Sequence, residues 1–182
     1  MSTITQTVAN FQYGAAQVTF NGVDLGLFKD AVTFTADNGY YEQVSSQSSM
    51  LLGKKLISER AVAVIAMQES VLDKITSICP HGTYVLDGSG SKKKIQFGGS
   101  QISTSDAKQL IITPTTDGSG TLTTDNNERV TIHLCLPEPK FAYQFSLENG
   151  EIVIPVEFHG IKDSTKDAGN QLYLLGDSTA TA

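Results

Sequence analysis

Turn-forming residues divide this sequence into short segments. Asparagine, aspartate, serine and glycine gather roughly every 8 to 15 positions, and the segments between them are rich in β-branched and aromatic residues. Such clusters favour tight turns, and such segments are typical of strands. The pattern predicts a mostly β fold, an antiparallel β-sandwich or barrel. We expect strands at 17–20, 31–37, 55–67, 83–86, 94–97, 108–113, 130–135, 141–145, 151–158 and 171–175.

One amphipathic helix is expected at residues 69–79. Val71, Ile75 and Ile78 recur at helical spacing, and Leu72 lies beside them. Glu69 suits a helix N-terminus, and Pro80 ends the segment. These four apolar side chains should pack the helix onto a sheet, which is a purely structural role.

A long polar loop is expected between two strands, over residues 42–54. It contains Glu42 and Val44, continues through a serine-rich stretch, and ends in Met50, Leu51 and Leu52. The three large apolar side chains could cover the protein's own core, or they could dock on another subunit. The strand after the loop turns into an unbroken apolar run at 61–67, which calls for cover on both faces.

Composition and charge exclude several classes of protein. The 182 residues fit one domain over 1–182, and charged residues make up 18%, below the usual quarter or so. Part of the surface is therefore expected to be covered by partners. The net charge of −6 argues against a tight nucleic-acid binder. We expect no membrane span and no signal peptide, so a soluble protein made in a cytoplasm, with Cys79 and Cys135 as buried reduced thiols.

The search for reactive chemistry yields no catalytic residue, metal site or cofactor. His81, His133 and His159 complete no recognisable zinc-ligand motif, and are expected in turns or on strand surfaces. Residues 87–94 faintly resemble a phosphate loop, but a strand follows where a helix is needed, so a hairpin turn is favoured. Paired glycosidase carboxylates leave no spacing signature, so a carbohydrate-binding or glycosidic jelly roll stays open, although the chain has no Trp.

Three stretches resemble the major tail tube protein family of long-tailed bacteriophages. They are DLGLFKDAVTFT at 24–35, GKKLISERAVAVIAM at 53–67 with the following helix, and IPVEFHGIKDSTK at 154–166 with QLYLLGD at 171–177. Together they cover a little under half the chain and keep the family's order. Tubes of contractile tails and injection machines share this fold, so an inner tube subunit of such a machine is the alternative.

The resemblance implies a structural virion protein and not an enzyme. Six copies would form a ring through an inner β-barrel, and rings would stack helically into the tail tube. That tube would enclose the tape-measure protein, meet tail-end proteins, and conduct double-stranded DNA into the host without binding it tightly. The chain would be made in the bacterial cytoplasm and end in the virion tail.

The resemblance also gives roles to particular residues. Stacking would use the loop at 42–54 with Glu42, Val44, Met50, Leu51 and Leu52, helped by flexible segments at about 1–14 and 176–182. Strand alternation in 151–158 turns Ile152, Ile154, Val156 and Phe158 inward and Glu157 to the opposite surface. Acidic side chains expected to face the lumen are Asp37, Glu59 and Glu157.

Overall fold

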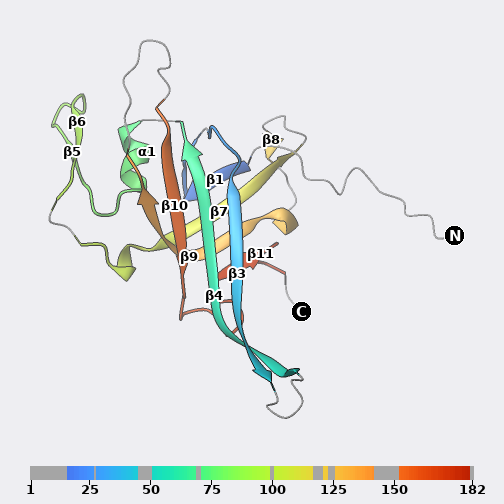
Figure 1. Cartoon of the computed structure of the whole chain (residues 1–182). Coiled ribbons are helices and arrows are strands. Elements are labelled where there is room, and N and C mark those ends of the chain that lie inside the picture. The colour runs from blue at the N-terminus through green and yellow to red at the C-terminus, as the bar shows by residue number, and fades with distance from the viewer. Residues whose placement is uncertain are drawn as a thin grey trace.

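In the residues that the structure describes, the fold is mostly antiparallel β-sheet, as the turn pattern predicts, with one short helix (Figure 1). The computed structural model describes residues 16–26, 28–44, 51–68, 71–98, 101–116, 121–122, 126–141 and 152–180. Its elements are β1 Ala16–Phe20, β2 Val23–Asp24, β3 Thr33–Val44, β4 Leu51–Met67, α1 Leu72–Ser77, β5 Thr83–Leu86, β6 Lys93–Gln96, β7 Lys108–Thr116, β8 Thr121–Leu122, β9 Val130–Pro139, β10 Ile154–Ile161 and β11 Tyr173–Leu175, with short 3-10 turns at Thr104–Asp106 and Asn126–Glu128.

The main sheet runs in the order β2-β1-β7-β9-β10-β4-β3, with β11 beside β9, and every described pair in it is antiparallel. β7 and β9 lie between β1 and β10 in this order, yet the rings of Phe20 on β1 and Phe158 on β10 lie 5.2 Å apart. The sheet therefore curls over, and the core fills the space between its two halves (Figure 1).

Strand alternation decides which residues enter the core. On β4, Ala61, Ala63, Ile65 and Met67 are buried, and the residues between them face outward. On β10 the expected inward set is confirmed. Ile154, Val156 and Phe158 are buried, whereas Ile152 is partly buried against the core just before the strand. The apolar run at 61–67 is thus covered on one face only.

The helix is shorter than the periodicity predicts. Val71 has an extended backbone, with φ −68° and ψ 124°, so it is the N-cap and the helix begins at Leu72. Ile75 and Ile78 are buried and Leu72 packs against the core, as expected, but Val71 is 52% exposed. The prediction that Val71 packs the helix onto the sheet was wrong. Val71 precedes the first helical turn, so its side chain does not belong to the apolar face of the helix. Residues 69 and 70 lie outside the described part.

The expected loop at 42–54 is largely strand. β3 continues through Val44 and β4 begins at Leu51, so the two form a long hairpin whose connection lies in 45–50, outside the described residues. Serine-rich composition concealed this pairing, because backbone hydrogen bonds across a hairpin require no particular side chains. The expected strand at 141–145 is also wrong at its start, since β9 ends at Pro139 and Phe141 lies beyond it outside any strand, and 142–145 lie outside the described residues.

The β5–β6 hairpin replaces any phosphate loop. Asp87 accepts hydrogen bonds from the Ser89 hydroxyl and the Lys92 amide, which closes the turn before β6. Cys79 and Cys135 are free and buried, and burial raises the pKa of each thiol to about 12. Among the described residues, no helix has the length and apolarity that crossing a membrane requires.

Candidate assembly surface

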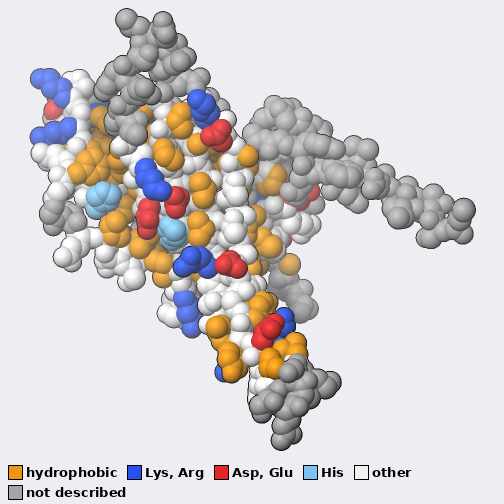
Figure 2. All heavy atoms as spheres, viewed as in Figure 1, with side chains coloured by type: hydrophobic (Ala, Val, Ile, Leu, Met, Phe, Trp, Pro, Cys, Tyr) orange, Lys and Arg blue, Asp and Glu red, His pale blue; other side chains and the backbone are white. Residues whose placement is uncertain are grey.

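The β3–β4 hairpin extends beyond the core with apolar side chains on its surface. Gly39 pairs with Ser58 and Tyr40 pairs with Leu56, so Ile57 forms a bulge where the hairpin leaves the body. Figure 2 shows apolar side chains gathered at this end of the molecule. They are Tyr40, Tyr41, Val44, Leu51, Leu52, Leu56 and Ile57, with exposures of 43% to 65%. We call these seven residues the hairpin patch.

The hairpin patch is too large to be an ordinary feature of a solvated surface. At about 100 Å² for each half-exposed large side chain, its seven members present about 700 Å² over the two faces of the hairpin, whereas an apolar patch on a monomer usually covers a few hundred Å². A standard protein interface buries about 800 Å² per partner. The hairpin therefore offers about the apolar area that a stable association requires.

The residues expected to form a docking loop have two different positions. Val44, Leu51 and Leu52 belong to the hairpin patch, with exposures of 53%, 51% and 64%. Glu42 instead pairs with Lys54 across the hairpin at 2.5 Å, and this hydrogen bond raises the pKa of Lys54. Met50 lies outside the described residues.

β3 is also the last strand of the sheet. Its 12 residues pair with β4 on one side, and in the described part of the chain no strand lies on its other side. A long exposed edge presents backbone donors and acceptors that another chain can pair with. The hairpin thus combines an apolar surface with an open strand edge.

Asp37 and Glu157 share the outer face of the sheet, and Glu59 lies on the other face. Glu157 is opposite Val64 on β4, and Asp37 is opposite Arg60, which alternation places on the same face as Val64. Glu59 alternates with Arg60 and so continues the core-facing side. The three carboxylates therefore do not form one acidic surface.

The outer face is close to neutral around Glu157. Lys140 donates a 2.5 Å hydrogen bond to Glu157, which lowers the pKa of Glu157 and raises that of Lys140. His159 Nε2 lies 3.6 Å from carboxylate oxygens of both Glu138 and Glu157. The resulting cluster mixes both signs of charge, and Figure 2 shows blue, red and pale blue side chains close together on this face.

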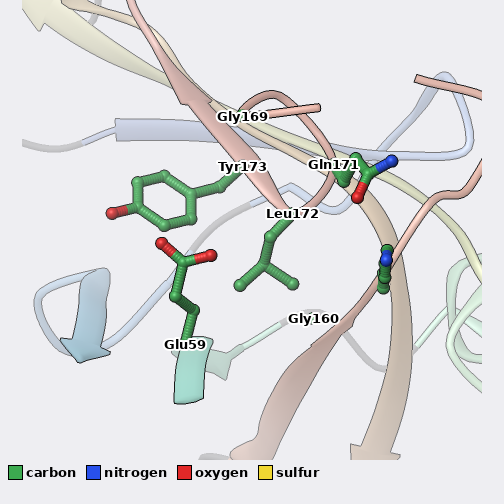
Figure 3. A pocket seen from close by; sticks show the side chains of 7 residues that line it. Glu59, Gly160, Gly169, Gln171, Leu172 and Tyr173 are labelled. Carbon is green, nitrogen blue, oxygen red and sulfur yellow. The ribbon is translucent and has the colours of Figure 1, made fainter. Parts of the chain in front are cut away.

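A hollow of about 480 Å³ lies beside Glu59, just before the buried stretch of β4. Gly160, Lys162, Gly169, Gln171, Leu172 and Tyr173 also line it, and the Glu59 carboxylate points toward Tyr173 and Leu172 (Figure 3). Glu59 supplies the one carboxylate among these lining residues. Glycoside hydrolysis ordinarily uses two carboxylates, and the described residues that line this hollow supply one.

The histidines are isolated from one another but are not alike. His133 was expected at a surface or turn, and it is instead buried, with Nε2 2.8 Å from Asn170 Oδ1. The ring of His81 lies tilted at 44° to that of Phe97, with ring centroids 5.4 Å apart. Within the described ranges, no group of three His, Cys, Asp or Glu side chains is arranged to hold a metal ion.

Sequence reasoning missed two aromatic features. Tyr40 and Tyr41 lie between the expected strand at 31–37 and the expected loop at 42–54, and their exposures of 54% and 60% follow from the hairpin leaving the core. Phe97 and Phe141 lie 44 positions apart in the sequence, yet their rings meet at 5.9 Å. No local pattern encodes a contact between residues so far apart.

Comparisons with known proteins give weak structural likenesses. No family model and no curated protein match the chain. The PVC sheath/tube terminator of an extracellular contractile injection system, in its extended state, is 12% identical, covering 86% of this chain and 94% of that one, with a TM-score of 0.49.

Two further solved structures are similar. One is the PVC sheath-tube complex, 12% identical over 80% of this chain and 83% of that one, with a TM-score of 0.48. The other is the tube-terminating cap of the anti-feeding prophage, 10% identical over 87% and 94%, with a TM-score of 0.49. At these values the likeness assigns no function to the chain.

Proposed function

We propose that this chain is a structural subunit that assembles with copies of itself into a tube of the phage-tail type. The observation that carries the proposal is the hairpin patch on a projecting β3–β4 hairpin. Leaving that much apolar surface in water is unfavourable by roughly 25 cal/mol per Å². Covering it with another copy removes this cost and explains why the hairpin extends beyond the core.

The open edge of β3 supports a closed ring. Lateral pairing of this strand with the neighbouring copy would satisfy its backbone groups, and closure would leave no edge exposed. The proposal takes the ring to contain six copies, and the hairpins to join one ring to the next. The outer face with Glu157 is proposed to line the lumen, through which DNA or the tape-measure protein passes.

The proposal covers both kinds of tube. The long-tailed phage tube was expected first from the sequence, whereas two of the similar solved structures described above come from an extracellular contractile injection system. In the contractile case the outside of the tube would also contact a sheath. Immunogold labelling of particles from producing cells would separate the two, because sheathed particles expose the tube only after contraction.

Electron microscopy of the purified protein tests the proposal. We expect rings and stacked tubes in negative stain, and a mass above that of one chain by light scattering. A protein that stays monomeric at high concentration, across low and high salt, would contradict it. That outcome would favour the binding or glycosidic alternative, in which a single copy is sufficient.

A further inference from the structure

The hairpin patch must meet a different surface on the next copy if the protein grows as a tube. Contact between two identical patches is symmetric, so it produces closed pairs and stops. A head-to-tail contact uses two different surfaces and can continue indefinitely. The inference that follows rests on the proposed function and asks which surface receives the hairpin.

An aromatic cluster away from the hairpin has the chemistry to receive it. It consists of His81, Phe97 and Phe141, with His81 and Phe141 rings 5.4 Å and 5.9 Å from that of Phe97. Phe97 is 51% exposed and Phe141 is 37% exposed. The cluster follows β6 and β9, on the α1 side of the molecule, whereas the hairpin tip lies at the other end (Figure 1).

Phe97 packs against the backbone of Gly82 and against the rings of His81 and Phe141. A β-carbon added to Gly82 would lie 3.0 Å from Phe97 Cε1, so the ring rests directly on the glycine. An aromatic side chain that is already fixed loses little conformational freedom on binding. Rigid aromatic anchors of this kind often carry most of the binding energy at an interface.

We infer that the hairpin patch of one copy docks on the aromatic cluster of a second copy. At about 100 Å² for each half-exposed large side chain, Phe97 and Phe141 supply about 200 Å² of apolar area as anchors for this contact. The hollow beside Glu59 is a poorer receiver, because Lys162, Gln171 and Glu59 make its lining polar. Outside these regions, exposed apolar residues such as Val23 and Leu175 are on separate elements.

Disulfide trapping tests the contact directly. Leu52→Cys and Phe97→Cys introduced together should give a ladder of covalent multimers on a non-reducing gel, because each copy would carry both halves of the contact. Leu52→Cys alone should give no more than background dimer. The native thiols of Cys79 and Cys135 are buried and should stay unreacted. Strong dimer from Leu52→Cys alone, with no ladder from the double variant, would mean tip-to-tip contact and overturn the inference.

A mixing experiment gives a second readout. Leu52→Asp removes the tip and Phe97→Glu removes the receiver, so neither variant should stack alone. When the two variants are mixed, the intact hairpin patch of Phe97→Glu can dock on the intact aromatic cluster of Leu52→Asp. The mixture should therefore form particles of twice the mass of either variant alone. Leu175→Glu is the matched control, and it should assemble as the wild type does.

The failure modes are distinct. If the wild type never assembles, the proposed function is wrong, and this inference with it. If the wild type assembles and Leu52→Asp does not, but folded Phe97→Glu stacks normally, the inference alone is wrong. Circular dichroism verifies the fold of each variant, and the cysteine pair replaces Phe97→Glu if that variant unfolds.

Discussion

Gly160 of β10 packs directly against Ala61 of β4. A β-carbon built on Gly160 would lie 3.1 Å from both the β-carbon and the carbonyl oxygen of Ala61, and 3.3 Å from Ile132 Cγ2. None of these atoms lies at the end of a flexible side chain that could move aside. This close approach of β10 to β4 thus depends on two very small residues.

Gly160→Ala should therefore destabilise the fold by about 1–3 kcal/mol, the usual cost of overpacking. Denaturant titration measures the loss. Gly88→Ala is the control, because nothing lies within 4 Å of a β-carbon there. Equal stability of the two variants would mean that β4 and β10 can separate without cost.

Ile75→Ala should cost about 2–5 kcal/mol, because Ile75 is 3% exposed in the core. Val71→Ala should cost far less, since Val71 is 52% exposed at the N-cap. Thermal melting compares the two. A small loss from Ile75→Ala would instead indicate that the helix is held for an outside partner.

Changing both Leu51 and Leu52 to aspartate should abolish tubes and leave the fold intact. The two side chains are 51% and 64% exposed, so the monomer loses little, while the assembly would have to bury charge. Electron microscopy and circular dichroism report the two effects separately. Normal tubes from this double variant would exclude the hairpin patch from stacking.

Acid should loosen the contact between α1 and the β5–β6 hairpin. Hydrogen bonds from Lys93 and then Tyr84, each 2.6 Å long, lower the pKa of Asp73 below its ordinary 3.8. Since the folded pKa is the lower one, this stabilisation is present above the pKa of the unfolded carboxyl and is lost as the pH falls through the folded value.

The difference in melting temperature between wild type and Asp73→Asn should thus be present near neutral pH and should disappear as the pH falls below 3.8. Melting curves across this range test it. A gap that stays constant down to the lowest pH would show that the carboxylate charge is irrelevant. Ser105→Ala offers a control outside the Asp73 cluster.

Glu157→Lys should let assembled tubes retain duplex DNA at low salt, whereas wild-type tubes should not retain it at about 0.15 M salt. Lys140 now neutralises Glu157, so the reversal frees one lysine and adds another on the same face. Filter binding against salt concentration measures the effect. Tight DNA binding by wild-type tubes would contradict a neutral lumen.

The sequence correctly predicted the features that depend on residues close together in the chain, such as which side chains of a strand or helix face the core. The inward set Ile154, Val156 and Phe158 follows from alternation alone, and Ile75 and Ile78 follow from helical periodicity. The hairpin was mistaken for a loop because its polar residues, among them Gln43 and Gly53, pair through backbone groups.

The arrangement of the candidate surface could not be predicted from the sequence in the same way. Which face Glu59 takes depends on the register with Asn38, and the contact between Phe97 and Phe141 depends on the whole fold. Pairings of this kind are decided by tertiary packing, which overrides any propensity within a short window.

The two strand pairings of β4, with β3 and with β10, become possible at different times during synthesis. β3 pairs with β4 as a local hairpin, which can close within about 1–10 μs of emerging from the ribosome. β10 pairs on the other side, with Ile154 opposite Met67, and at about 5–20 residues per second it follows many seconds later. A nascent chain would therefore display its adhesive hairpin before its core can close. Exposed hairpins on chains from neighbouring ribosomes could then contact one another before the chains have folded. Slower translation after Met67 should therefore increase aggregation.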